Sequence, residues 1–171
     1  MARSACPMCR EEHWRLGRQG ILGSLAAAPR RLAASIRRTR GPRLRRRPGP
    51  HEWSVVEVLA HLLDVELVLG FRVRKTAAEP GSVLTAWDQE QWTAGLRHRR
   101  ADAHRTLAAF TALRADTVAL MRRLTRAQRR ARARHPEYGR VRVDQMVAHV
   151  AEHDLNHLQQ IQKTLAALAR R

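Results

Sequence analysis

Three histidines, His61, His153 and His157, occupy positions where a helix would otherwise carry core aliphatic residues. His153 and His157 are four residues apart, so a helix places both rings on one face, one turn apart. Two imidazoles at this spacing can reach one ion about 2.0–2.1 Å from each nitrogen. Upstream, His61 lies in an apolar row with Val58 and Val65. Unpaired buried imidazoles are costly, so the pattern indicates a shared metal ion, with ordinary core or surface histidines as the alternative.

The third ligand of such an ion is expected from another helix, because His149 lies about 12 Å along the helix axis from His157. His61 is the histidine most embedded in an apolar face. Three histidine ligands leave open positions for water or substrate, as in a reactive site. Imidazole ligands suit zinc or nickel, which we expect first, with iron, cobalt or manganese as alternatives.

Several polar residues near these histidines are candidates for orienting a ring or lining a pocket. Glu57 and Asp64 each lie about one turn from His61, and Glu66 stands among leucines. The alternatives to a role at the site are a residue of the helix cap and an acid exposed to solvent. The full set of candidates is Glu57, Asp64, Glu66, His149, Trp87, Asp88 and Trp92. The other histidines are in charged or turn-like surroundings and are predicted to lie at the surface: His13, His51, His98, His104 and His135.

Four long helices are expected to position these residues. The first spans about residues 22–36, where Pro29 should kink or restart it. The second begins at the S-x-x-E capping box of Ser54 and Glu57 and runs to about residue 75. The third covers residues 107–124 and the fourth about residues 144–169.

A short helix is expected in the crossover between the second and third long helices, with Thr85 as its cap and Trp87, Asp88 and Trp92 within it. Residues 136–139 read as a loop, and no alternating stretch is long enough for a sheet. The fold class is therefore all-α, a four-helix bundle with a short crossover helix. Residues 1–15 form a polar, flexible lead-in, and residues 16–171 form the bundle.

The formal net charge of +18 comes almost wholly from arginine, since Lys75 and Lys163 are the only lysines. Such a charge fits nucleic acid, anionic substrates or a membrane surface, or follows from a GC-rich genome. The basic residues are spread along the chain with few aromatics to stack on bases, which does not favour a nucleic-acid site. If one exists, its candidate residues are Arg43, Arg45, Arg46, Arg47, Arg129 and Arg130.

No run of about 20 apolar residues is present, and the polar start lacks a signal-peptide core, so a cytoplasmic protein is expected. Cys6 and Cys9 should then be reduced. With His13 they resemble half a zinc knuckle, or a redox pair that lacks the usual strand-then-helix setting. A loosely attached segment without either role is the remaining alternative.

Three sequence blocks together resemble the DinB superfamily, over a match from about residue 16 to the C-terminus. They are residues 53–66, which contain His61, residues 87–92, which contain two tryptophans, and residues 153–161, which contain His153 and His157. The resemblance implies a four-helix bundle with long crossovers in up-down-down-up order. It also implies a divalent metal bound by His61, His153 and His157. The cysteines near the start and the arginine content depart from the usual family pattern.

The resemblance implies an enzyme that acts on a small molecule. Members with assigned activity are mostly transferases or isomerases that use low-molecular-weight thiols such as bacillithiol or mycothiol, and many others are described only as metal-dependent hydrolases. Thiol transfer is therefore our first expectation, by analogy, and hydrolysis the second. A basic bundle that binds nucleic acid or protein, with a structural metal or none, is the third. A homodimer is an option that no residue in the sequence supports.

Overall fold

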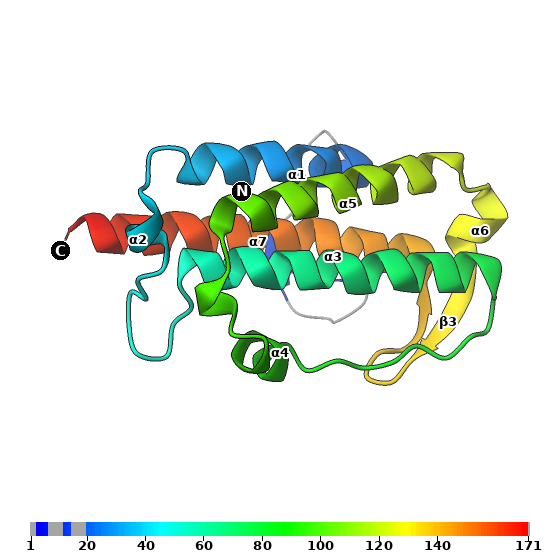
Figure 1. The fold of residues 1–171 in the computed structure, drawn as a ribbon. Coiled ribbons are helices and arrows are strands. Elements are labelled where there is room, and N and C mark those ends of the chain that lie inside the picture. The colour runs from blue at the N-terminus through cyan, green and yellow to red at the C-terminus, as the bar shows by residue number, and fades with distance from the viewer. Residues whose placement is uncertain (1–2, 7–11, 15–19, 171) are drawn as a thin grey trace.

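Four long helices form the body of the protein in the computed structural model, which describes residues 3–6, 12–14 and 20–170 (Figure 1). They are α1 (Gly20–Ile36), α3 (Val55–Ala78), α5 (Ala103–Arg123) and α7 (Val143–Ala169). In Figure 1, α1 and α7 run in one direction, and α3 and α5 run in the other. Both α1 and α3 pack against α5 and α7. The predicted four-helix bundle in up-down-down-up order is thus confirmed.

The expected restart at Pro29 is not observed, because α1 continues through it, and a kink there stays a prediction. Proline removes the backbone N–H that would bond to the carbonyl four residues earlier, here that of Leu25. The guanidinium of Arg114 on α5 approaches that carbonyl instead, with its Nη1 at 3.4 Å from the Leu25 oxygen. A neighbouring helix therefore supplies a donor where the helix itself has none.

The predicted start of α3 is confirmed. Ser54 is the N-cap and accepts from the backbone N–H of Glu57, while the Glu57 carboxylate accepts from the backbone N–H of Ser54. These reciprocal bonds satisfy two of the donors that a helix start leaves without intrahelical partners. The short helix α2 (Gly41–Leu44) lies in the connection before this start.

The crossover from α3 to α5 contains α4 (Gln89–Gly95) and the 3₁₀ turn η1 (His98–Arg100). The expectation that Thr85 caps the short helix is wrong. Asp88 is the N-cap and accepts from the N–H groups of Glu90 and Gln91, so Trp87 and Asp88 precede the helix. A carboxylate at this position also complements the positive end of the helix dipole.

Two small antiparallel hairpins depart from the expectation of a chain without sheet. β3 (Arg132–His135) pairs with β4 (Gly139–Arg142) after the short helix α6 (Arg126–Arg130), and β1 (Arg3–Ala5) pairs with β2 (Glu12–Trp14). In the β3–β4 turn, Gly139 has φ +67°, a conformation that suits glycine. Strands of three or four residues are too short for alternation to be visible in a sequence. The division of the chain at residue 16 stays a prediction.

The core has two apolar clusters, one toward each end of the bundle. The first gathers around Leu69, Val73 and Met146, and the second around Leu59, Phe110 and Ile161. Within the described part of the chain, no helix is long and apolar enough to span a membrane. Between the two clusters, polar side chains from α3, α5 and α7 are buried. The candidate site is built on the same stretch of α3 and α7.

Candidate metal centre

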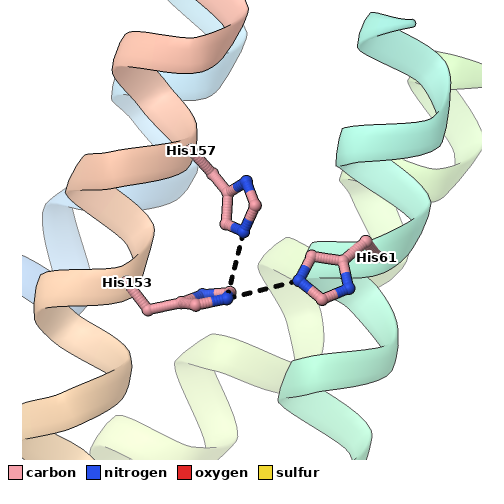
Figure 2. Close-up of side chains that lie close together, drawn as sticks. All are labelled: His61, His153 and His157. Atoms are coloured by element: carbon pink, nitrogen blue, oxygen red, sulfur yellow. Dashed lines mark hydrogen bonds between the residues drawn. The ribbon is translucent and has the colours of Figure 1, made fainter. Parts of the chain in front are cut away.

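Helices α3 and α7 bring the three histidines together (Figure 2). The Nε2 atom of His153 lies 3.2 Å from Nε2 of His61 and 3.0 Å from Nε2 of His157. The candidate ligand atoms of all three rings lie within 4.8 Å of one another. In Figure 2 the two α7 rings, one helical turn apart, point across the helix interface at the α3 ring. His61 is fully buried, while His153 and His157 are half-buried.

The spacing of these nitrogens fits a bound metal ion. Nitrogens about 2.0–2.1 Å from a tetrahedral ion lie roughly 3.3 Å from one another. A neutral ring nitrogen carries either one proton or one lone pair, so Nε2 of His153 can form only one well-directed N–H···N bond. It has two such neighbours at hydrogen-bond distance. A shared cation satisfies all three lone pairs at once.

Burial keeps His61 and His157 in the neutral form that a metal needs. Burial, and to a smaller extent repulsion from His157 and His98, lowers the pKa of His61 to about 3. Burial also lowers the pKa of His157, against an opposing hydrogen bond to Gln160 and the charge of Asp154. Among the described residues, no hydrogen-bond partner meets Nδ1 of His61.

The histidines open onto a cavity of about 1500 Å³. Its wall near His61 is aromatic, with ring centroids 5.0 Å away for Trp53 and 5.9 Å away for Trp87. Trp87 and Asp88 line the cavity, as expected for pocket residues. Trp92 packs edge-on against Trp87 at 4.8 Å between ring centroids and so supports the wall from behind.

Comparisons with known proteins identify the family and the fold. A family model described as DinB superfamily matches residues 24–161. The chain belongs to the DinB superfamily. A solved structure of YfiT from Bacillus subtilis matches with a TM-score of 0.81 and 19% sequence identity, over 91% of each chain. YfiT is described as a probable metal-dependent hydrolase with an unusual four-helix bundle topology. No curated protein matches the chain.

In this DinB-superfamily protein, Glu57 and Asp64 do not orient His61 as hypothesised. The Glu57 carboxylate accepts from Arg47, from the Ser54 hydroxyl and from the Ser54 backbone. Asp64 faces the buried His98, whose Nε2 lies 3.1 Å from Asp64 Oδ2. Burial raises the pKa of Asp64, and the charge of His98 opposes that rise. Both carboxylates thus hold connecting segments against α3.

Glu66 is buried in an ionic cluster with Arg114 and Asp154. Arg114 Nε donates to Glu66 Oε2 at 2.6 Å, and its Nη1 and Nη2 donate to the two oxygens of Asp154. Burial raises the pKa of both carboxylates, and the attraction of Arg114 opposes that rise. Asp154 directly follows the candidate ligand His153, so the cluster holds the ligand-bearing part of α7 against α3 and α5.

His149 lines the cavity one turn before His153, at 6.1 Å between ring centroids. Its Nδ1 lies 3.3 Å from Sγ of Cys6, which is buried. Cys9 lies outside the described residues, and of the His13 side chain nothing is described. This contact places Cys6 against α7, one turn from the candidate ligand His153, and the role of the N-terminal segment stays a prediction.

Four of the six arginines considered for nucleic acid make internal contacts. Arg43 donates to the Leu168 carbonyl, Arg45 to the Ala101 carbonyl and Arg47 to Glu57. In the other basic stretch, Arg129 donates to the carbonyl of Arg122. Arg46 and Arg130 are exposed. These bonds reduce the number of arginines available for a phosphate backbone.

Two histidines predicted to lie at the surface are buried: His98 is 6% exposed and His135 is 5% exposed. His51 and His104 are exposed, as expected. Sequence reasoning also missed Gln160, whose Oε1 lies 2.7 Å from Nδ1 of His157, and Arg114. Gln160 follows His157 by three residues, and Arg114 follows Phe110 by four on the buried face of α5, so helical spacing could have indicated both.

Proposed function

We propose that this protein is a divalent-metal-dependent enzyme that transfers a low-molecular-weight thiol to a small electrophile at the three-histidine site. The observation that supports this most is the convergence of three Nε2 atoms, 3.0 and 3.2 Å apart, at the wall of a large cavity. Zinc or nickel is the expected ion, with iron, cobalt or manganese as alternatives.

A divalent ion bound there would supply a Lewis acid that lowers the pKa of a thiol or of water and stabilises the resulting anion. His61, His153 and His157 would hold it through their Nε2 atoms. Gln160 keeps the proton of His157 on Nδ1, so that the lone pair of Nε2 faces the centre. Trp53 and Trp87 exclude water from one side of the site.

Thiol transfer is favoured over hydrolysis by the position of the carboxylates. Activating water benefits from a positioned general base, whereas a thiolate is already the attacking nucleophile. The carboxylates that line the cavity are all exposed: Glu52, Asp88, Glu90 and Glu137. Four buried carboxylates of α3 and α7 are instead engaged with Arg47, His98 or Arg114: Glu57, Asp64, Glu66 and Asp154.

Hydrolysis is the second candidate, because the fold neighbour YfiT is described as a probable metal-dependent hydrolase. The same three histidines would serve that reaction, with water in place of the thiol. The two reactions differ in one measurable requirement. A transferase needs the added thiol for turnover, and a hydrolase turns over without it.

Elemental analysis of purified protein tests the metal first. We expect about one divalent ion per chain in the natural protein and none in a variant with His61, His153 and His157 all changed to alanine. His104→Ala, at an exposed position on α5, is the matched control and should keep the ion. Circular dichroism checks that the bundle remains folded.

Activity is then measured with a panel of cellular thiols and small electrophiles, with and without the thiol. His153→Ala should lower turnover by about 100-fold or more while His104→Ala leaves it unchanged. Full turnover by chelator-treated, metal-free protein would falsify the proposal. Turnover that is independent of the thiol would replace transfer with hydrolysis.

A further inference from the structure

His135, at the end of β3, carries a buried N–H group with no partner in the described part of the chain. Its Nδ1 accepts from the backbone N–H groups of Glu137 and Tyr138, at 3.2 and 3.4 Å. Nδ1 therefore has no proton, and the proton of the neutral ring is on Nε2. No hydrogen-bond partner meets that Nε2 among the described residues, although His135 is only 5% exposed. A buried donor without an acceptor needs an explanation.

Arg72, on the last turns of α3, places a half-buried positive charge near His135. Its Nη2 donates to the Thr85 carbonyl at 2.6 Å, which anchors the crossover segment, and a guanidinium has further N–H groups to donate. Next to Thr85, the backbone N–H of Leu84 donates to the Arg134 carbonyl at 2.9 Å, which places this segment beside His135. Burial lowers the pKa of His135, and the charge of Arg72 lowers it further. In Figure 1, the β3 strand lies below the end of α3, beside the crossover segment.

Arg72 and His135 line the same cavity as the three histidines. Tyr138 stacks on His135 at 4.6 Å between ring centroids and lies 6.4 Å from the ring of His149, which precedes His153 by one turn. Arg72 follows His61 by eleven residues on α3, about 16 Å along the helix axis. The cavity thus joins the three histidines to an end where Nε2 of His135 lacks an acceptor and the guanidinium of Arg72 carries a positive charge.

The groups that face Arg72 leave room for an anion. Glu137 is the nearby carboxylate, and its charge raises the pKa of Arg72 against the larger, lowering effect of burial. The Glu137 carboxylate is on an exposed residue, whereas Arg72 is half-buried. Tyr138, 38% exposed, stacks on the His135 ring and lines the cavity beside it.

We propose that Arg72 and His135 form an oxyanion subsite that binds the carboxylate or phosphate end of the substrate. The inference rests on the proposed function, in that the other end of this substrate reacts at the three histidines. Guanidinium and imidazole N–H groups both donate, and together they match an anionic oxygen group. The substrate class is an elongated molecule whose anionic group lies on the order of 10–15 Å from its reacting atom.

The binding test uses the full-length protein after treatment with a chelator, so that no metal competes for the anion. Sodium acetate and inorganic phosphate are the probes, acetamide is the neutral match for acetate, and chloride keeps the ionic strength constant. Nuclear magnetic resonance follows the ring signals of His135 and the backbone amides of Glu137 and Tyr138. We expect saturable shifts with acetate, phosphate or both, at a Kd of about 1 mM, and none with acetamide. Acetate alone indicates a carboxylate, and phosphate alone a phosphate ester.

Two variants test the subsite independently. His135→Asn keeps a side-chain oxygen that can accept from the turn N–H groups but removes the Nε2 donor. Arg72→Gln removes the charge. Either should weaken binding about tenfold, as followed by the amide signals. Arg134→Gln, at an exposed arginine next to His135, is the charge-matched control and should bind as the natural protein does. Glu137→Gln should bind more tightly.

The proposal is overturned if neither probe gives saturable shifts, if acetamide gives the same shifts, or if Arg134→Gln loses as much binding as Arg72→Gln and His135→Asn. The proposal is also overturned if Arg72→Gln and His135→Asn both bind the anion as the natural protein does. Metal content and turnover are measured separately. Anion binding by a protein that never holds a metal refutes the proposed function and leaves the subsite standing. A metal-loaded, active protein that binds no anion refutes the subsite alone.

Discussion

Nε2 of His157 can bind a metal only when the proton of the neutral ring is on Nδ1. Gln160 lies on the same side of α7, and its Oε1 accepts a hydrogen bond from Nδ1–H of His157, with 2.7 Å between the nitrogen and the oxygen. Neither a lone imidazole nor an i, i+4 pair fixes the tautomer by itself, because the proton can occupy either nitrogen. The sequence shows the histidine pair, whereas the partner of each ring depends on rotamers and on neighbouring helices.

Gln160→Leu is expected to weaken metal binding about 10–100-fold, because Nδ1–H of His157 loses its acceptor and the ring loses its fixed orientation. Gln160→Glu should retain the affinity, since a carboxylate accepts the same hydrogen bond. Competition with a chromophoric chelator measures both. Gln162→Leu, at an exposed position of α7, is the control. Equal affinity in Gln160→Leu and the natural protein would show that Gln160 does not orient the ligand.

At the scale of elements, the start of α3 combines a local cap with a contact from the preceding connection. Burial opposes the ionisation of Glu57, but hydrogen bonds from Arg47 and Ser54 outweigh it and lower its pKa below the ordinary 4.5. A lowered folded pKa means that the unfolded chain binds protons more readily in that range. The stabilisation is therefore complete above about pH 4.5 and is lost as the pH falls through the folded pKa.

Glu57→Gln should therefore destabilise the protein by about 1–2 kcal/mol at pH 7 and by progressively less below pH 4.5. Urea unfolding at several pH values measures the difference. Glu79→Gln, at the exposed C-cap of the same helix, removes only a surface pair with Lys75 and should change little. A difference between Glu57→Gln and the natural protein that does not vary with pH would contradict the role assigned to the Glu57 charge.

The long helices were predictable because their signals are local. The Ser54 cap and the apolar rows of α3, α5 and α7 are all visible within one segment. The short elements were not predictable in this way. Asp88 caps α4 in place of Thr85, and Trp87 before it packs beside His61, a residue distant in sequence. The β3–β4 hairpin is built from arginine-rich tetrapeptides, whose only buried apolar side chains are Ala133 and Val141.

At the scale of the whole molecule, Arg114 connects all four long helices. From α5 it donates to Glu66 on α3, to Asp154 on α7 and to the Leu25 carbonyl that Pro29 leaves without a helical partner on α1. The ionic cluster of Arg114, Glu66 and Asp154 lies between the two apolar clusters of the core. Sequence patterns indicated Glu66 as a buried polar residue. They could not pair it with Arg114, because the pairing depends on how three helices are rotated against one another.

Arg114→Met should destabilise the protein by about 3–5 kcal/mol, since it leaves two carboxylates buried without a counter-charge. Adding Glu66→Leu and Asp154→Leu should recover much of that loss, because no buried charge remains. Urea unfolding gives the free energy of unfolding of the natural protein, of Arg114→Met and of the triple variant. Arg105→Met, exposed on the same helix, should cost less than about 0.5 kcal/mol. A small effect of Arg114→Met alone would show that the cluster is solvated in solution.

The net charge of +18 also belongs to the whole molecule. Arg43, Arg45 and Arg47 each donate a hydrogen bond to an acceptor within the protein. We therefore expect weak DNA binding at 50 mM salt that disappears by about 150 mM, as counterion release predicts for nonspecific contacts. Fluorescence anisotropy with a labelled duplex measures this.

We expect Arg46→Gln and Arg122→Gln to reduce the low-salt DNA binding equally. Both arginines are exposed, one in the connection before α3 and the other on α5. A defined interface would make the two variants differ, because only one of them would lie within it. Binding tighter than about 10⁻⁷ M at physiological salt, lost in Arg46→Gln and kept in Arg122→Gln, would establish a nucleic-acid site. That result would give the positive charge a role separate from the metal centre, since the three histidines and their cavity lie between α3 and α7.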